Sequence, residues 1–328
     1  MKKIIIDCDP GHDDAIAILL AAGNPEIDLL GITTVAGNQT LEKITRNAQS
    51  VCAVAGINVP IAKGSSVPLV QKQVVAGDIH GTTGLDGPFL PEPTFDLDSR
   101  HAVDFIIDTV MSHEPNTVNL VPIGPLTNIA LAMRKEPQII SRVESVIVMG
   151  GAYTRGNVSP VAEFNIYVDP EAADAVFSAD WPVTMVGLDL THQALARKEL
   201  QDRVAAIGGD ISTFVLDVWE FVGSTYREVY EFDYPPIHDA CCVAALINPN
   251  VFTTARAEVK VELRGEYTRG MTVTNFESEP GMNHSNVVDP ETTRFTTDVA
   301  MELDWNMFAD QIVDSIANLT AQLPPKTD

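Results

Sequence analysis

Basic residues are scarce in this sequence. The 328 residues include 21 Lys and Arg against 45 Asp and Glu, so the formal net charge is −24. Proteins that bind nucleic acid neutralise phosphates with Lys and Arg, and an anionic membrane surface repels a chain of this charge. We therefore expect no nucleic-acid partner and no membrane partner. An acidic, solvated surface accounts for most of the excess charge.

Long apolar runs and paired cysteines are also missing. The longest helix-like apolar run, 15–22, is too short to span a bilayer. The apolar stretch near the N-terminus is three residues long and Asp7 follows it, unlike a signal peptide. The four cysteines, at positions 8, 52, 241 and 242, form no C-x-x-C pair, which argues against a disulfide framework. We expect a cytoplasmic protein with reduced thiols.

Short apolar segments alternate with helical ones over the first 190 residues. The apolar segments predict strands at 3–7, 29–35, 60–62, 118–122, 143–149 and 183–188. The segments between them predict helices at 13–22, 40–55, 99–113, 125–134 and 170–179. Strands that are apolar along their whole length are typical of a parallel sheet covered by helices on both faces.

The remaining chain is expected to be helical to about residue 247, with hairpin-like strands near 258–263 and 271–276 and a helix near 305–319. We predict the α/β class: a single Rossmann-like domain over residues 1–328, with a mostly parallel central sheet, flanking helices and a small C-terminal β-hairpin element. The irregular segment 64–98 is long for a loop, and such loops are often functional. The polar segment 277–296 predicts a surface hairpin or an oligomer contact.

Four carboxylates fall within eight residues where the first predicted strand ends. Residues 7–14 read Asp-Cys-Asp-Pro-Gly-His-Asp-Asp, and open α/β sheets bind ligands beyond the carboxyl ends of their strands. A capped helix with acidic residues in its first turn explains one or two of these acids. Four acids held together raise one another's pKa, and a divalent cation removes that conflict. Oxygen ligands point to Ca²⁺ or Mg²⁺, although the spacing is not that of an EF-hand.

Further polar groups lie at other predicted strand ends. Asp239 opens a helix, and the backbone carbonyls of 121–125 follow a buried strand, so both are candidate ligands. Amides and carboxylates without Lys or Arg suit a neutral polyhydroxylated ligand such as a sugar; they are Asn38, Asn157, Glu163 and Asn165. The sequence contains neither a Gly-x-x-x-x-Gly-Lys loop nor a Gly-x-Gly-x-x-Gly motif after a strand.

Several of these segments resemble a known family. Asp-Cys-Asp-Pro-Gly-His-Asp-Asp-Ala at 7–15 is similar to the N-terminal signature of the inosine–uridine-preferring nucleoside hydrolases. Further matches follow in the family's order: Thr-Thr-Val-Ala-Gly-Asn at 33–38, Gly-Pro-Leu-Thr-Asn at 124–128, Val-Met-Gly-Gly at 148–151, Ala-Glu-Phe-Asn at 162–165 and His-Asp at 238–239. The resemblance implies a calcium-dependent homo-oligomer, a dimer or tetramer, that cleaves the N-glycosidic bond of ribonucleosides in purine or pyrimidine salvage.

The resemblance also implies roles for individual residues. The side chains of Asp9, Asp14 and Asp239 and the carbonyl of Ile123 would hold Ca²⁺, and Asp9 would be the general base. Some relatives have Thr where this chain has Ile123, a change that a backbone ligand tolerates. His238 would protonate the departing base. The ribose would be held by Asp13, Asn38, Met149, Asn157, Glu163 and Asn165, and the base pocket would be lined by His80, Phe164, Tyr226 and His238.

Two other interpretations remain open from the sequence. Asp7-x-Asp9 at a strand end fits the nucleophile motif of haloacid-dehalogenase-type phosphotransferases, although the later Lys and acidic motif of that class have no convincing copy here. A calcium-dependent nucleoside-binding protein without catalysis could use the same scaffold. The complete set of Asp9, Asp13, Asp14 and Asp239 argues against that second interpretation.

Overall fold

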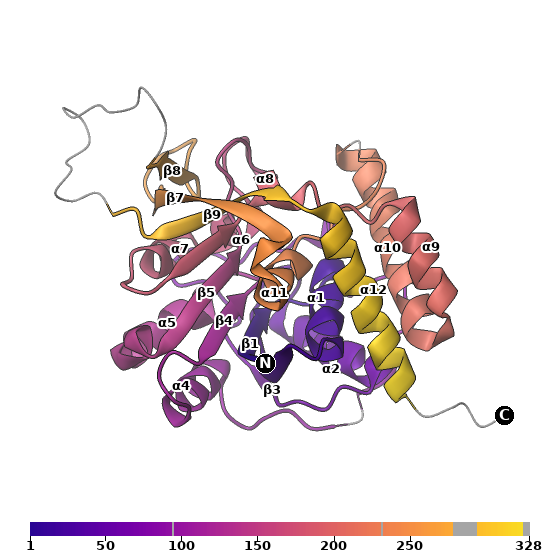
Figure 1. Ribbon diagram of the computed structural model, residues 1–328. Coiled ribbons are helices and arrows are strands. Elements are labelled where there is room, and N and C mark those ends of the chain that lie inside the picture. The colour runs from indigo at the N-terminus through magenta and orange to yellow at the C-terminus, as the bar shows by residue number, and fades with distance from the viewer. Residues whose placement is uncertain (94, 231, 278–293, 324–328) are drawn as a thin grey trace.

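The computed structural model describes residues 1–93, 95–230, 232–277 and 294–323. Within them, nine strands form one sheet in the order β3-β2-β1-β4-β5-β6-β9-β7-β8 (Figure 1). The strands are β1 (Lys2–Cys8), β2 (Ile27–Thr34), β3 (Ile61–Lys63), β4 (Val118–Pro122), β5 (Val143–Met149), β6 (Val183–Val186), β7 (Phe252–Val261), β8 (Thr272–Phe276) and β9 (Thr297–Leu303). All neighbours pair in parallel except β7, which is antiparallel to both β8 and β9.

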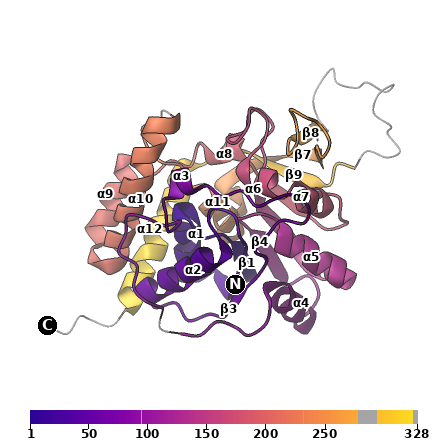
Figure 2. The ribbon, with the colours of Figure 1, turned by 180° about the vertical axis from the view of Figure 1, so that it is seen from behind.

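Helices cover both faces of this sheet (Figures 1 and 2). They are α1 (His12–Gly23), α2 (Leu41–Ala55), α3 (Gly77–His80), α4 (Ala102–Ser112), α5 (Thr127–Lys135), α6 (Phe164–Val168), α7 (Pro170–Phe177), α8 (Leu188–Thr191), α9 (Lys198–Ile207), α10 (Gly209–Tyr230), α11 (Ala240–Ile247) and α12 (Trp305–Gln322). Two short 3₁₀ turns span Pro137–Ser141 and Pro249–Val251. No helix in the described part of the chain is both long and apolar enough to cross a membrane.

The core has two layers, one on each side of the sheet. Ile4 and Ile6 of β1 pack with α1, α2, α10, α11 and α12, whereas Ile5 between them packs with α4, α5 and α7. Successive side chains of a strand point to opposite faces, so a strand buried on both faces must be apolar at every position. Burial of each such Ile contributes roughly 1.5–3 kcal/mol. This double burial is why β1 reads as an uninterrupted apolar run.

The strand order reverses at β1, and this reversal determines where a ligand site can lie in the fold. Strand β1 pairs with β2 on one side and β4 on the other, and the register aligns Asp7 with Thr33 and Pro122. The carbonyl of Asp7 accepts a hydrogen bond from the backbone N–H of Ile123 at 2.8 Å, which ties the chain leaving β4 to the end of β1. A crevice opens outside the carboxyl ends of parallel strands where the strand order reverses. The acidic motif therefore begins at this crevice.

The predicted α/β architecture is confirmed. The predicted C-terminal hairpin exists as β7 and β8, but it continues the central sheet, because β9 joins β7 to β6. The sequence prediction missed β9, and it also missed α3 within the segment 64–98 and α6 between the predicted strand 143–149 and the predicted helix 170–179. Most of the segment 277–296, for which the sequence predicts a surface hairpin or oligomer contact, lies outside the described residues.

Candidate active site

A cavity of about 460 Å³ lies at the carboxyl ends of β1, β4 and β5. Its volume suits a small organic molecule. All the predicted site residues except Asp9 and Asp14 line it: Asp13, Asn38, His80, Ile123, Met149, Asn157, Glu163, Phe164, Asn165, Tyr226, His238 and Asp239. None of the described lining residues is Lys or Arg, so the cavity wall has no basic side chain.

The acidic motif is shaped by the start of α1. The Asp14 carboxylate accepts hydrogen bonds from the backbone N–H groups of Gly11, at 2.9 Å, and Asp9, at 3.1 Å. Asp14 therefore caps the N-terminus of α1, so the capped-helix explanation holds for this one acid. A Cβ at position 11 would lie 2.6 Å from Nδ1 of His80, which is too close, so the turn requires glycine at this position. Capping explains Asp14 alone, and Asp9, Asp13 and Asp239 need another cause.

Asp9 lies directly behind the cavity wall and is 1% exposed. Its Oδ2 accepts a hydrogen bond from the backbone N–H of Asn38 at 2.6 Å, whereas Oδ1 is buried and has no hydrogen-bond partner. A Cβ at Gly37 or Gly124 would lie 2.1 or 2.4 Å from this carboxylate. These two glycines keep space beside Asp9, and an orphaned buried carboxylate oxygen is a sign that a cation or water belongs there.

Three carboxylates converge beside Asp9. Oxygens of Asp13, Asp14 and Asp239 lie within 4.8 Å of one another, which is close enough to share one cation. The family resemblance implies that Asp9 binds the metal and that Asp13 binds the ribose. In the structure, however, the three carboxylates that lie close together include Asp13 and not Asp9. Ile123 also lines the cavity, and its backbone carbonyl accepts a hydrogen bond from Nδ2 of Asn165 at 2.9 Å, which leaves that oxygen one lone pair.

Burial and neighbouring carboxylates both disfavour the ionised forms of this cluster. Burial, followed by the charge of Asp14, raises the pKa of Asp13 to about 8. Burial also raises the pKa of Asp14 to about 6 and those of Asp9 and Asp239 well above the usual range. A divalent cation among these oxygens would reverse the shifts, because the ionised form would then gain a positive neighbour. The donor set is oxygen only, and it fits Ca²⁺ or Mg²⁺.

The neighbouring wall is a set of amides and one acid held by backbone groups. Glu163 accepts hydrogen bonds from the N–H groups of Gly151, Asn165 and Ile166 at 2.8–3.1 Å, and burial raises its pKa to about 7. Nδ2 of Asn165 donates to the carbonyls of Ile123 and Met149. Oδ1 of Asn157 accepts from the N–H of Phe164 at 3.0 Å. These contacts fix the wall before any ligand arrives.

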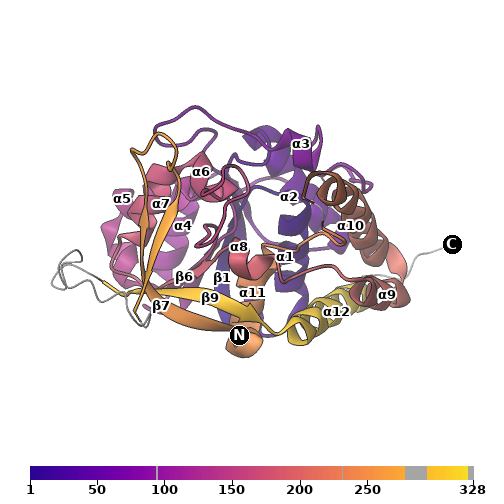
Figure 3. The same cartoon turned by 90° about the horizontal axis from the view of Figure 1, so that it is seen from above.

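Histidines and a tyrosine form the opposite end of the cavity. Nε2 of His238 lies 3.0 Å from the hydroxyl of Tyr226, and Nδ1 lies 2.7 Å from Oγ1 of Thr191. Nδ1 of His80 lies 3.0 Å from Nδ1 of His12. Burial lowers the pKa of His238 well below its usual range and that of His80 to about 3. Figure 3 shows that α3, which carries His80, lies beside α10, which carries Tyr226.

Neither Thr191 nor His12 was predicted from the sequence as a site residue. No motif marks Thr191, which follows a buried strand by five residues and is found only through its contact with His238. His12 had a signal, since it lies inside the acidic motif, but a single histidine at the start of a helix is ordinary.

Asp7 does not behave as a nucleophile. It is fully buried, and its Oδ1 accepts hydrogen bonds from Oγ1 of Thr33 at 2.6 Å and Nδ2 of Asn128 at 2.8 Å. It is not among the described residues that line the cavity. The phosphotransferase interpretation, which requires an accessible Asp7, is therefore wrong: this side chain ties β1 to β2 and α5.

Known proteins share this arrangement. The family model of inosine-uridine preferring nucleoside hydrolases matches residues 4–310. The inosine-uridine preferring nucleoside hydrolase of Leishmania major is 50% identical over 320 residues, which are 97% of this chain and 98% of the relative. The pyrimidine-specific ribonucleoside hydrolase RihB of Escherichia coli is 47% identical over 272 residues, 83% of this chain and 87% of the relative.

A solved structure gives the same result. The purine-preferring ribonucleoside hydrolase from Gardnerella vaginalis superposes with a TM-score of 0.87 at 33% identity and covers 97% of this chain and 99% of its own. Family model, sequence identity and fold agree, which confirms the family resemblance and the enzyme class predicted from the motifs. The chain belongs to the inosine-uridine preferring nucleoside hydrolases, enzymes that hydrolyse the N-glycosidic bond of ribonucleosides.

Proposed function

We propose that this enzyme converts ribonucleosides and water to ribose and free base with one Ca²⁺ held at the acidic cluster. The observation that carries the proposal is the set of four carboxylates, Asp9, Asp13, Asp14 and Asp239, beside a cavity whose described lining has no Lys or Arg. Asp9, Asp14, Asp239 and the carbonyl of Ile123 would be the protein ligands. When bound, the ion would anchor sugar hydroxyls and the attacking water and offset the charge of the acids.

Asp9 is the proposed general base. Its Oδ1 has no hydrogen-bond partner, and a cation bound at the cluster would keep the carboxyl ionised, so this oxygen could take a proton from the water. In the proposed step a water oxygen bonds to C1′ of the ribose and its proton passes to Oδ1 of Asp9. The C1′–N bond breaks at the same time, and its electron pair leaves with the base.

The amide and acid wall is suited to the sugar. An N-glycoside breaks through an oxocarbenium-like sugar, as an O-glycoside does. The carboxylates of Asp13 and Glu163 lie on the cavity wall and can stabilise that positive charge electrostatically. We propose that Asp13, Asn38, Met149, Asn157, Glu163 and Asn165 hold the ribose hydroxyls and hydroxymethyl group.

The histidine end is suited to the departing base. The base gains negative charge as it leaves and needs a proton. Burial keeps His238 neutral, so one of its ring nitrogens carries hydrogen, and the hydroxyls of Tyr226 and Thr191 occupy both sides of the ring. We propose that the His238–Tyr226 pair delivers the proton to the base. His80 and Phe164 would complete the base pocket.

Uridine fits the names of both relatives that are most similar in sequence among those described above. One set of relatives is named for inosine and uridine, and another for pyrimidine ribonucleosides, a class that includes uridine. The absence of Lys and Arg from the described cavity wall favours an uncharged nucleoside over a nucleotide. Purine or pyrimidine salvage follows from such an activity.

The test is an assay of ribose release from uridine, inosine and cytidine after treatment with a chelator and re-addition of Ca²⁺ or Mg²⁺. We expect ribose from uridine, loss of activity on chelation and recovery with Ca²⁺. Calcium-dependent tight binding of uridine without ribose release would refute catalysis and favour the nucleoside-binding alternative. Recovery with Mg²⁺ alone would refute the assignment of the ion.

Three sequence predictions stay predictions: a single domain over 1–328, a cytoplasmic location and a homo-oligomer. Light scattering on the purified protein distinguishes a monomer from the expected dimer or tetramer.

A further inference from the structure

His12 is the one histidine of the acidic motif, and the reaction proposed above gives it no role. It is 1% exposed, and its two ring nitrogens have different partners. Nε2 lies 2.8 Å from the backbone carbonyl oxygen of Asp86, and Nδ1 lies 3.0 Å from Nδ1 of His80. The chain of contacts thus runs from the carbonyl of Asp86 through His12 to His80.

The chemistry of these contacts fixes where the protons are. A carbonyl oxygen only accepts, so Nε2 of His12 must carry hydrogen. Both rings are buried, with His12 1% and His80 9% exposed, and the hydrogen-bond partners of His12 are a ring nitrogen and a backbone carbonyl, with no carboxylate to offset a charge. Both rings are therefore neutral. A neutral imidazole has one N–H, which leaves Nδ1 of His12 as an acceptor. Nδ1 of His80 must then be the donor, and Nε2 of His80 has no hydrogen.

The surroundings hold this arrangement in place. The plane of the His12 ring is nearly parallel to those of His80 and Phe221, at interplanar angles of 20° and 8° and centroid distances of 5.3 and 5.1 Å. The Asp86 carboxylate accepts from the backbone N–H groups of Thr82, at 2.9 Å, and Thr83, at 3.0 Å, which positions the carbonyl of the same residue. Gly81 has φ +79°, and a Cβ there would lie 2.2 Å from Oδ2 of Asp86, so this tight loop requires glycine.

Nε2 of His80 has no hydrogen-bond partner among the described residues. The two ring nitrogens of an imidazole point in diverging directions, so Nε2 points away from His12, and His80 lines the cavity. We propose that His12 is a positioning residue that locks His80 as the Nδ1–H tautomer, so that the bare Nε2 accepts a hydrogen bond from an N–H of the nucleobase. This inference rests on the proposed function. Uridine has a single such group, N3–H, so we expect selection for bases with an N–H donor at that edge.

The first test measures the tautomer in the protein without any substrate. Long-range ¹⁵N–¹H correlation spectra of histidine-labelled enzyme distinguish protonated from bare ring nitrogens, and the spectra of His80→Gln and His12→Gln assign the signals. We expect His80 protonated at Nδ1 and bare at Nε2, and His12 the reverse. Protonation of His80 at Nε2, or at both nitrogens, would overturn the proposal. This result does not depend on whether the enzyme hydrolyses nucleosides.

The second test measures selectivity. Wild-type enzyme, His12→Leu and His12→Gln are compared on uridine and on 3-methyluridine, which lacks the N–H. We expect the wild type to prefer uridine by about tenfold or more, the value of one good hydrogen bond. His12→Leu removes the acceptor that holds the proton on Nδ1, and we expect it to lose most of that preference. The amide of His12→Gln can both accept from His80 and donate to Asp86, and should keep more of it.

Two outcomes separate this role from others. A preference that stays unchanged in His12→Leu would show that the methyl group is rejected by its size, and would overturn the proposal. p-Nitrophenyl riboside has no N–H on its leaving group, so a purely structural role of His12 would lower its kcat/KM as much as that of uridine. A larger decrease in kcat/KM for uridine than for p-nitrophenyl riboside supports the role of His12 in setting the tautomer. No ribose release from any substrate by wild-type enzyme would instead refute the proposed function.

Discussion

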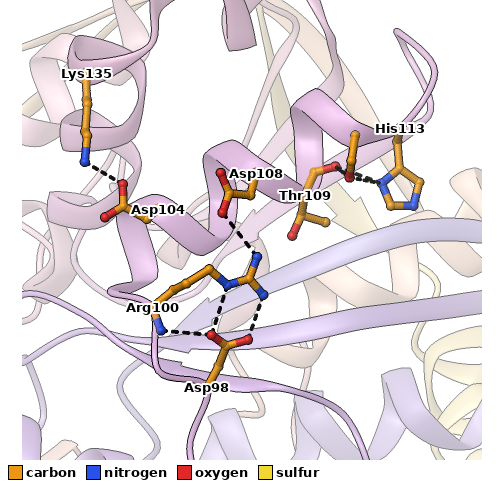
Figure 4. Close-up of polar contacts among 8 residues, drawn as sticks. Asp98, Arg100, Asp104, Asp108, Thr109, His113 and Lys135 are labelled. Atoms are coloured by element: carbon orange, nitrogen blue, oxygen red, sulfur yellow. Dashed lines mark hydrogen bonds and ion pairs between the residues drawn. The ribbon is translucent and has the colours of Figure 1, made fainter.

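Two groups of acidic side chains in this protein have opposite environments. On the surface, Asp98, Asp104 and Asp108 each meet a basic partner (Figure 4). Arg100 lies 2.7 Å from Asp98 and 3.3 Å from Asp108, and Lys135 lies 2.5 Å from Asp104. At the end of β1, the carboxylates of the active site have one another as charged neighbours and no basic residue on the described cavity wall.

The pKa shifts of the two groups run in opposite directions. Hydrogen bonding to Arg100 lowers the pKa of Asp98, so its ionised form is favoured. Burial raises the pKa of Asp13 to about 8, so its ionised form is penalised. Surface ion pairs are worth little in water, whereas a charge kept buried without a partner costs several kcal/mol. The comparison teaches that the surface acids are balanced by basic residues of the chain itself, whereas the buried acids have no such partner on the described cavity wall, which supports the proposed cation.

The largest expected effect is on Asp9. Asp9→Ala removes the proposed general base and a proposed metal ligand together, so we expect kcat/KM for uridine to fall about a thousandfold or more. Asp104→Ala on the surface is the matched control, and it should hydrolyse uridine at the wild-type rate. Kinetics with both variants test this, and near-normal turnover by Asp9→Ala would contradict its assignment.

Metal removal should have the next largest effect, a loss of thermal stability whose size depends on pH. In the folded protein the pKa of Asp13 is about 8, above the ordinary value of 3.8. Without metal, the contribution of Asp13 to the free energy of unfolding is therefore fully present below about pH 4 and is lost as pH rises toward 8. A bound cation favours the ionised carboxylates and should cancel the loss. The increase in Tm on adding Ca²⁺ should therefore grow from pH 5 to pH 8.

The surface group supplies the contrast for that experiment. Asp98 has a lowered pKa, so its stabilising contribution is present above the unfolded pKa and is lost as pH falls through the folded value. Scanning calorimetry with chelator and with Ca²⁺ across this pH range separates the two signs. A calcium-induced rise in Tm that is constant or shrinks with pH would show that the buried acids are not the binding site.

A smaller effect is expected at the other end of the cavity. His238→Ala should lower kcat/KM for uridine and inosine by about a hundredfold, the usual contribution of a general acid. p-Nitrophenyl riboside releases a group that needs no proton, so its hydrolysis should fall much less. Parallel assays on the three substrates test this prediction. An equal decrease in kcat/KM on all of them would show that His238 is not the general acid.

The order of these elements along the sequence explains what could be predicted. Strand β1 is buried on both faces, so its continuous apolar run identifies a parallel sheet without any knowledge of its neighbours. Residues 7–14 lie within a short stretch of chain, so the amino-acid order alone reveals three acids of the cluster, Asp9, Asp13 and Asp14. Asp7 from the same stretch instead ties β1 to β2 and α5. Strand β9 was missed because Thr297–Leu303 carries Asp298 and Glu302, and pairing with β6 and β7 outweighs its weak local pattern.

The rest of the site depends on contacts between distant residues. Oδ1 of Asp9 is orphaned because Gly37 and Gly124, 28 and 115 positions away, leave space around it, and no local pattern records that. His12 and His80 meet only because the loop after α3 returns to the start of α1. The motifs and the family resemblance therefore predicted residues that the fold brings to one cavity, whereas the hydrogen-bond partners of these residues had to come from the fold.

The smallest expected effect is on the surface group. Arg100 lies over the ring of Phe105, 4.7 Å from its centroid, as well as beside Asp98 and Asp108. Because the Arg100 side chain is 38% exposed, solvent screens these pairs, and we expect Arg100→Ala to lower the free energy of unfolding by about 1 kcal/mol or less. Urea denaturation measures this, and uridine turnover should be unchanged. A loss of several kcal/mol, or a changed response to Ca²⁺, would show that the surface acids are not independent of the buried ones.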